Sequence, residues 1–210
     1  MVLRGAGGRA FSAGFDLTNL TGDEDDRRAD EAIGRAVTAI EDCPVPVIAE
    51  LRGHCHGAAV EIALASDVRI AGDDLGLALR AVRLGVTYRF QLLARLAQVC
   101  GLGRAEHLLL AMPVLDARTA LAWGLVGEVV PAPGLEERVA EIAAMIAAEP
   151  RTALIGTKAS FRMLRRRALD ADDLARAEDL RRSAAVSPER KAALERARAS
   201  RPGARAKRAD

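Results

Sequence analysis

Residues 53–67 read Gly-His-Cys-His-Gly-Ala-Ala-Val-Glu-Ile-Ala-Leu-Ala-Ser-Asp, and this stretch decides the fold. It follows a short β-branched run, Val45 to Leu51, which is typical of a buried strand. Apolar residues with helical spacing begin at Ala59. The stretch therefore predicts a strand that turns through small residues into a helix. The first-turn amides of such a helix and its dipole both favour an anion above Gly57 and Ala58.

Glu61 is the carboxylate at this predicted helix start, on the same side of the helix as Ala58. Enolate chemistry needs amides that hold a developing oxyanion beside a group that moves a proton. A purely structural interpretation also stands at this point. A Gly-rich turn before an Ala-rich helix is common, and a first-turn Glu often only compensates the helix dipole.

A second segment adds to this motif. Residues 2–17 read Val-Leu-Arg-Gly-Ala-Gly-Gly-Arg-Ala-Phe-Ser-Ala-Gly-Phe-Asp-Leu, a strand followed by a glycine-punctuated loop. Together with Gly57 to Asp67, this resembles the crotonase superfamily, the enoyl-CoA hydratases and isomerases. Ser66 to Ala71 is similar to the strand after the family's catalytic helix, and Ala122 to Pro131 to the helix-to-strand step that closes its core. The resemblance implies an α/β fold, a ββα spiral core with a C-terminal helical region.

The resemblance also implies roles for individual residues. The oxyanion hole would use the backbone amides of Phe15, just before the Asp of a Ser-Ala-Gly-x-Asp loop, and of Ala58. Phe15 replaces the more usual Ala and Ala58 the more usual Gly, which keeps both donors and changes the shape of the pocket. Glu61 would be the acid/base. The expected substrate-binding residues are Ala13, Leu17, His56, Gly57, Ala81 and Tyr88.

The departures from the family bear on the reaction. Many hydratases of the family carry a second Glu in a Pro-Glu pair before a Leu-Gly step, and here Ala81 holds that position. Hydration is easiest with two carboxylates, whereas one suffices to shuttle a proton and move a double bond. Glu61 alone therefore favours isomerase chemistry. Residues 86–91 replace a common Pro-Gly-Ala-Gly-Gly loop and bring Tyr88 and Arg89 toward the acyl group.

The pair His54 and His56 around Cys55 raises the alternatives of a metal site and of a Cys nucleophile. Neither is favoured, because His107 lies in a predicted helix without zinc-site spacing and the histidines next to Cys55 point elsewhere on an extended strand. Cys55 is predicted to be a small buried residue. No metal and no cofactor are expected, since coenzyme A enters as part of the substrate.

Composition excludes other classes of protein. Aromatic residues make up 3% of the 210 residues, so the stacking platforms of single-strand nucleic-acid binders are absent. The net charge is +2. The basic runs at Arg165–Arg167 and Arg196–Arg208 are interpreted as a solvated helix face and a frayed tail. Attraction of the phosphates of coenzyme A by these runs is an alternative. Three unpaired Cys, with no signal peptide and no membrane-spanning run, predict a cytoplasmic protein with no nucleic-acid or membrane partner.

The chain is predicted to divide into a core, residues 1–134, and a C-terminal helical region, residues 135–210, whose tail is disordered from about Pro202. Expected strands are 1–4, 45–51, 67–71 and 126–130, with an acidic loop at 22–26. Expected helices are 27–41, one after Arg89, 104–111, 118–123, 135–148, 151–167, 170–186 and one from Pro188.

Two function classes remain open from the sequence. One is an acyl-CoA enzyme that works through an enolate, and the other is a catalytically weak or inactive paralogue that assembles but binds CoA poorly. Family members usually begin with a further strand and helix that help to hold the adenosine of coenzyme A, and the expectation is that this chain lacks them. The helices from Arg104 to Trp123 and from Leu135 onward are richer in Ala and Leu than one sheet needs, which together with the resemblance predicts a homotrimer or hexamer.

Overall fold

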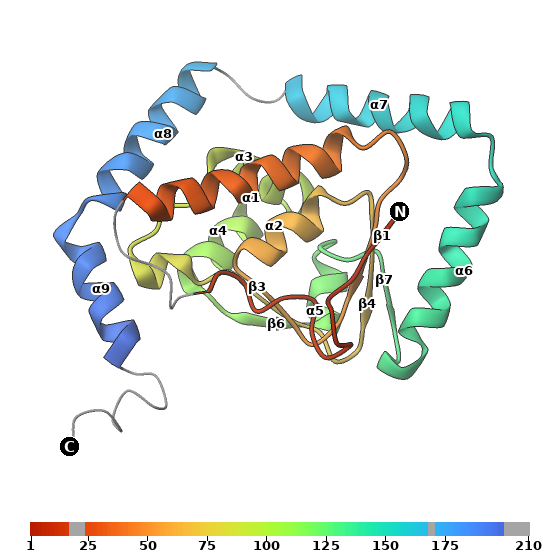
Figure 1. The fold of residues 1–210 in the computed structure, drawn as a ribbon, viewed down its shortest axis with the longest axis horizontal. Coiled ribbons are helices and arrows are strands. Elements are labelled where there is room, and N and C mark those ends of the chain that lie inside the picture. The colour runs from red at the N-terminus through yellow and green to blue at the C-terminus, as the bar shows by residue number, and fades with distance from the viewer. Residues whose placement is uncertain (17–23, 168–170, 200–210) are drawn as a thin grey trace.

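Two small sheets form the centre of the molecule in the computed structural model, which describes residues 1–16, 24–167 and 171–199 (Figure 1). The first sheet has the order β1-β2-β4-β7 and is parallel throughout. Its strands are β1 (Val2–Leu3), β2 (Ile48–Leu51), β4 (Val68–Gly72) and β7 (Glu128–Val130). The second sheet has the order β3-β5-β6, with β3 (His54–His56) parallel to β5 (Gly76–Ala78) and β6 (Val114–Asp116) antiparallel to it.

The chain passes from the first sheet to the second twice, from β2 into β3 and from β4 into β5. Helix α2 (Ala58–Ala65) lies between these two passages in sequence, so strand, strand and helix repeat as a spiral. This is the predicted α/β ββα core. The sequence did not predict the second sheet, because its strands are only three residues long and have no alternating pattern to reveal them.

The remaining helices surround this core (Figure 1). Their bounds are α1 Glu24–Asp42, α3 Phe90–Cys100, α4 Leu102–Glu106, α5 Ala117–Ala122, α6 Leu135–Ala148, α7 Arg151–Arg167, α8 Ala171–Ala185 and α9 Pro188–Ala199, with short 3-10 turns η2 at Ala81–Leu84 and η4 at Ala132–Gly134 and a π-helical turn η3 at His107–Ala111. The predicted acidic loop at 22–26 is wrong where it can be compared, because α1 already begins at Glu24. The predicted helix at 104–111 is divided between α4 and η3.

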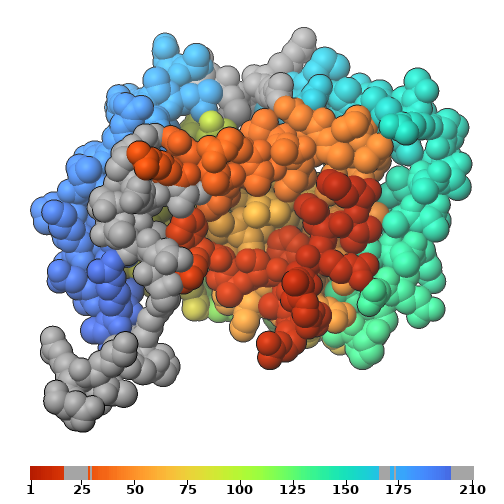
Figure 2. Space-filling view, viewed as in Figure 1, coloured from red at the N-terminus to blue at the C-terminus, as the bar shows by residue number. Residues whose placement is uncertain are grey.

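Helix α2 is buried on nearly every side. Six of its eight residues are buried, and α1 packs across it. In the space-filling view, α1 runs across the near face and α2 shows only as a small patch beneath it (Figure 2). Aliphatic side chains, among them Leu51, Val60 and Leu77, form the main core. The carboxylate of Glu61 is therefore held at the centre of the molecule rather than on a solvated face.

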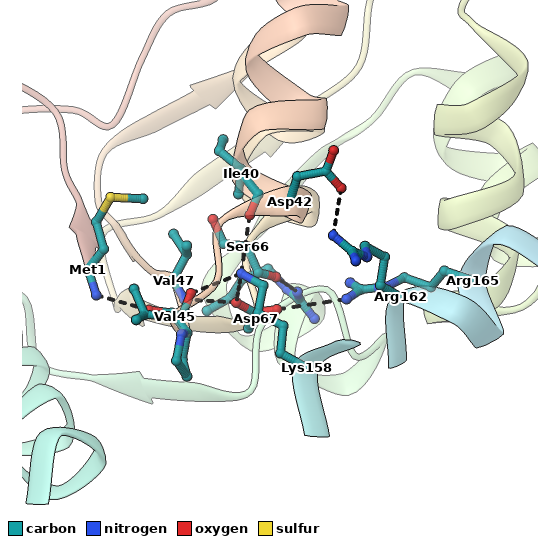
Figure 3. A network of polar contacts seen from close by, with 12 residues as sticks. Met1, Ile40, Asp42, Val45, Val47, Ser66, Asp67, Lys158, Arg162 and Arg165 are labelled. Atoms are coloured by element: carbon teal, nitrogen blue, oxygen red, sulfur yellow. Dashed lines mark hydrogen bonds and ion pairs between the residues drawn. The ribbon is translucent and has the colours of Figure 1, made fainter. Parts of the chain in front are cut away.

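The C-terminal helices are attached to the core at separate points. Leu135 and Val139 of α6 pack on Ile48 and Ile70 of the first sheet. Helix α7 is attached through Lys158, which is 7% exposed. Its ammonium group lies 2.7 Å from Asp67 Oδ2 and donates to the backbone oxygens of Ile40 and Val45, both at 3.1 Å (Figure 3).

The predicted division at residue 134 stays a prediction. The predicted disordered tail and Leu17 lie outside the described residues. Helices α6 to α9 confirm the helical character of the C-terminal region over the residues that the structure describes. No helix among them is both long and apolar enough to cross a membrane.

Candidate active site

A cavity of about 340 Å³ lies over the N-terminus of α2. It is bounded by the loop before residue 16, by α1, by the segment from Ala78 to Arg89, and by α8 and α9. Eight of the nine predicted site residues line it: Ala13, Phe15, His56, Gly57, Ala58, Glu61, Ala81 and Tyr88. The structure thus brings the two sequence motifs together at one place. We call this the front cavity.

The loop that carries Phe15 is held against the strand before α2. Phe11 and Ser12 donate backbone hydrogen bonds to Arg52 and His54, each at 2.9 Å. At Gly14, φ is 94°, and a Cβ would come within 2.6 Å of the carbonyl oxygen of His56. Only glycine fits so close an approach at that backbone angle. The Ser-Ala-Gly loop is therefore placed beside the start of α2 by its own sequence.

Helix α2 begins at Ala58, and Gly57 precedes it. The amide of Gly57 is occupied, because it donates to Ala78 O at 2.8 Å. The first-turn amides of a helix have no intrahelical acceptor, so the amide of Ala58 is at a position where an anion is favoured. This arrangement has the chemical capacity to stabilise negative charge on a carbonyl oxygen.

Glu61 lies one turn further along α2 and is 7% exposed. Its Oε1 is 2.6 Å from Nη2 of Arg89, the residue just before α3. Burial raises the pKa of Glu61, and the nearby Arg89 partly opposes this rise. A raised carboxylate pKa brings the group closer to neutral pH, where it can both accept and return a proton. Sequence reasoning placed Arg89 near the acyl group but missed this ion pair.

Tyr88 and Ala81 form one contact of the cavity wall. The backbone amide of Ala81 donates to the Tyr88 hydroxyl oxygen at 2.8 Å. Burial raises the pKa of Tyr88 to about 12, so the phenol stays protonated at neutral pH. The small side chain at Ala81 leaves room at this wall. Tyr88 therefore has a fixed position and a proton available for a hydrogen bond to a ligand.

The histidine and cysteine residues of β3 have different surroundings. Cys55 is fully buried, which confirms the prediction of a buried residue, and burial raises the pKa of its thiol to about 12. Such a thiol is a poor nucleophile at neutral pH. Burial and the neighbouring His54 lower the pKa of His56, which faces the front cavity as a neutral ring. Within the described ranges, no three His, Cys, Asp or Glu residues gather as they would around a metal ion.

Several charged residues of the front cavity were not predicted. Asp30 of α1 and Glu178 of α8 also line it, and both pair with Arg181, at 2.5 Å and 2.7 Å. Arg181 also donates to the carbonyl oxygen of Thr87 at 3.2 Å. The contacts of Arg181 with Asp30 and Thr87 join segments that are 151 and 94 residues apart, so no local pattern could have shown them. Among the described residues, Glu61 is thus one of three carboxylates that line the cavity, and the other two share one guanidinium group.

The sequence profile of the family described as Enoyl-CoA hydratase/isomerase matches residues 1–196. The chain belongs to this family. Among curated relatives, a probable enoyl-CoA hydratase of Mycobacterium avium is 34% identical over 161 residues, which is 75% of this chain and 62% of the relative. A peroxisomal Delta(3,5)-Delta(2,4)-dienoyl-CoA isomerase of Arabidopsis thaliana is 31% identical over 174 residues, 76% of this chain and 62% of the relative. This crotonase chain thus spans less than two thirds of the length of both.

The fold comparison agrees with the family. The crotonase chain matches the solved structure of a methylmalonyl-CoA decarboxylase in complex with 2-nitronate-propionyl-CoA with a TM-score of 0.87 and 26% identity, over 95% of this chain and 78% of that one. A solved enoyl-CoA hydratase of Mycobacterium avium subsp. paratuberculosis matches with a TM-score of 0.80 and 30% identity, over 95% and 77%. The α/β crotonase fold predicted from the sequence is confirmed.

Proposed function

We propose that this chain acts on an acyl-CoA thioester by stabilising an enolate, with Glu61 as the acid/base. One observation carries the proposal: the Phe15 loop, the start of α2 and Glu61 all line a single cavity. The amides of Phe15 and Ala58 would hold the thioester oxygen. Charge that develops on that oxygen is stabilised more strongly by fixed donors than by mobile water.

The proposed reaction is the movement of a double bond. The Glu61 carboxylate takes a proton from a carbon of the acyl group, and the electron pair of that C–H bond enters a dienolate whose charge rests on the thioester oxygen. The O–H bond of Glu61 then breaks and a new C–H bond forms at another carbon. The side chains of Asp30 and Glu178 are 33% and 40% exposed and share Arg181, whereas that of Glu61 is 9% exposed, which supports Glu61 as the carboxylate that moves the proton.

Decarboxylation is a second candidate, and Arg89 favours it. A guanidinium group beside Glu61 could pair with a carboxylate on the acyl group. Loss of CO₂ would leave its bonding electrons in the enolate, and a protonated Glu61 would then supply the proton to carbon. The raised pKa of Glu61 is compatible with that protonated state.

The test is turnover of three substrates by the purified protein: crotonyl-CoA for hydration, a 3-enoyl-CoA for isomerisation and methylmalonyl-CoA for decarboxylation. We expect the 3-enoyl-CoA to react fastest. Turnover of methylmalonyl-CoA alone would establish the second candidate. No turnover, together with no binding of butyryl-CoA by calorimetry, would establish an inactive paralogue and contradict the proposal.

Ala81→Glu tests the choice between isomerisation and hydration. The side chain at this position lines the front cavity, so a carboxylate there would supply the second acid of the family's hydratases. We expect the rate of crotonyl-CoA hydration to rise relative to isomerisation. An unchanged ratio would contradict the argument from a missing second acid.

We also propose that the chain assembles as a homotrimer or hexamer. Large apolar side chains around α4 to α5 are exposed, including Leu102 at 66% and Leu110 at 70%. Exposed apolar residues of this kind are typical of subunit interfaces. Light scattering at micromolar concentration should give about three or six times the chain mass of 22.3 kDa. A mass near that of one chain would contradict the assembly.

A further inference from the structure

A second cavity, of about 220 Å³, lies on the other side of Glu61 between α1, α3 and α7. We call it the rear chamber. Glu61 and Arg89 line both the front cavity and the rear chamber. The other residues of the rear chamber are Gly34, Val37, Thr38, Glu41, Gln91, Ala94, Arg95, Gln98, Arg162 and Arg165. The ion pair of Glu61 and Arg89 is therefore a partition between two spaces.

The rear chamber suits water. Most of its lining side chains are polar or charged, and Thr38, Gln91 and Gln98 at its rim are exposed to solvent. A polar cavity that holds several water molecules and opens to solvent is normally filled. Water can thus approach Glu61 from α1 and α3 even when a ligand occupies the front cavity.

Apart from the two of the partition, the charged side chains of the rear chamber have ion-pair partners other than Glu61, and Arg165 lies 3.7 Å from Asp67. Arg95 pairs with Glu41, and Arg162 with Asp42 at 3.0 Å. The groups that act on the Glu61 carboxylate are Arg89 and Arg181, which favour its charged form, and Asp30, which disfavours it. Tyr88 faces it as a neutral phenol. Among the described side chains on the chamber side, none therefore replaces Arg89 as the counterion of Glu61.

Gly34 explains how Arg89 comes to form the partition. It lies in the interior of α1, where glycine costs about 1 kcal/mol relative to alanine. A Cβ at this position would come within 2.2 Å of Nη1 of Arg89. That guanidinium group also donates to the carbonyl oxygen of Asp30 at 3.2 Å. The missing side chain of Gly34 leaves the space in which Arg89 lies between α1 and Glu61.

We propose that the rear chamber is the route by which Glu61 exchanges its proton with solvent while an acyl-CoA fills the front cavity, and that Arg89 is a positioning residue that separates the two spaces. This inference rests on the proposed function of Glu61. After Glu61 has taken a proton from carbon, its O–H bond has two fates. The proton returns to the acyl group, or it passes to chamber water, which returns a solvent proton to the carboxylate.

The exchange is measured as deuterium incorporation during isomerisation of a saturating 3-enoyl-CoA in D₂O. For the unaltered protein we expect solvent deuterium in most product molecules. Ala94→Leu adds bulk to the rear chamber and should lower the incorporation per turnover at least threefold. Ala97→Leu is the matched control on the same helix, because Ala97 lines neither cavity within the described residues, and it should leave the incorporation unchanged.

Thr38→Leu repeats the test at the exposed rim of the chamber, where a substitution does not disturb the core. Equal incorporation in Ala94→Leu, Thr38→Leu and the unaltered protein would overturn the proposal. Product without solvent deuterium in the unaltered protein would overturn it as well. Both results leave the proposed function intact, because turnover itself is observed.

A second measurement needs no turnover. The carboxyl carbon of Glu61, labelled with ¹³C and assigned by its loss in Glu61→Gln, is titrated by NMR in the ligand-free protein. If chamber water solvates this carboxylate, Ala94→Leu should raise its pKa, because removal of water disfavours the charged form. An unchanged pKa would overturn the rear chamber as a source of water. If that pKa rises but no acyl-CoA reacts, the proposed function fails and the hydration of Glu61 stands.

Discussion

The two ends of helix α2 hold carboxylates in opposite ways. Glu61, in the first turn, faces a cavity and pairs with Arg89 at 2.6 Å. Asp67, just after the helix, pairs with Lys158 at 2.7 Å, and its Oδ2 also accepts from the amide of Val47 at 2.8 Å. Lys158 in turn uses its remaining donors on two backbone oxygens (Figure 3). Both ion pairs border a cavity, but the Lys158–Asp67 pair is saturated with hydrogen bonds, whereas the Glu61 carboxylate pairs with one guanidinium group.

The difference teaches how one short helix serves two purposes. A buried ion pair whose hydrogen bonds are complete is costly to break and holds segments in place. A buried carboxylate that depends on one close counterion keeps the freedom to gain or lose a proton. We therefore expect changes at the Asp67 end to affect stability and changes at the Glu61 end to affect reactivity.

Glu61→Gln is the strongest way to test the reactive end. The amide keeps the size of the side chain but cannot accept a proton at neutral pH. We expect kcat for the 3-enoyl-CoA to fall about 10² to 10⁴-fold, the usual contribution of general acid–base catalysis. Glu178→Gln is the matched control, because it makes the same change in a cavity carboxylate held by Arg181, and it should cost less than about tenfold. Equal losses of kcat in both variants would mean that Glu61 has no special role among the carboxylates of the cavity.

Lys158→Met tests the structural end. It leaves the partly buried Asp67 without its close cation and frees two carbonyl oxygens of their donor. We expect the free energy of unfolding in urea to fall by about 3 kcal/mol, the lower part of the range for a broken buried pair. Activity per folded molecule should remain. The double variant with Asp67→Asn should recover part of the lost free energy of unfolding. If it recovers none, the broken ion pair is not the cause of the destabilisation.

Arg89→Met tests how the counterion sets the charge of Glu61. Glu61 accepts a proton only when ionised, so the rate should fall as the pH drops through its pKa, which burial holds above the ordinary value of 4.5. Arg89 lowers this pKa, so its removal should move the acidic limb of the pH–rate profile to higher pH. In the folded state, a raised pKa means that the contribution of Glu61 to stability is largest at acidic pH and is lost as the pH rises. If the acidic limb does not move, it reports the titration of a group other than Glu61.

Gly34→Ala should have the smallest effect, and Gly156→Ala is its control. Both glycines lie inside helices, but a Cβ at Gly156 meets no atom within 4 Å, whereas one at Gly34 meets Arg89. Gly156→Ala should stabilise the protein by about 0.5–1 kcal/mol through helix propensity. Gly34→Ala should stabilise the protein less than Gly156→Ala does. It should also move the acidic limb of the pH–rate profile to higher pH, as Arg89→Met does. Equal stabilisation with an unmoved limb would show that Arg89 has room elsewhere.

The reactive end of α2 could be predicted from the sequence because its signal is local. The loop through Phe15 and the turn at Ala58 each carry small residues at fixed spacing. Glu61 is three residues after Ala58, so its place in the first turn of the helix follows from the sequence alone. The bounds of α6 and α7 were predicted for the same reason, because their apolar residues keep helical spacing over many residues. The three-residue strands β3, β5 and β6 carry no comparable signal.

The structural end could not be predicted in full. Asp67 was recognised as part of a motif, but its partner Lys158 lies 91 positions later, and nothing near either residue indicates the other. The Arg89–Glu61 and Arg181–Asp30 pairs are distant in the same sense. One weak signal was present: Lys158 stands in a helix whose other basic residues are all arginine, among them Arg151 and Arg162. A lone lysine of this kind indicates a need for a compact ammonium group.

The way Lys158 is held also bears on the chemical durability of a protein that would handle thioesters. A free amine attacks a thioester carbonyl and becomes acylated, whereas a guanidinium group stays protonated and does not. The sequence contains three lysines, at positions 158, 191 and 207. The amine of Lys158 is buried with its protons engaged. The described cations around the front cavity, Arg80, Arg89, Arg181, Arg182 and Arg190, are all arginines. A reactive acyl group in that cavity would meet positive charge that it cannot modify.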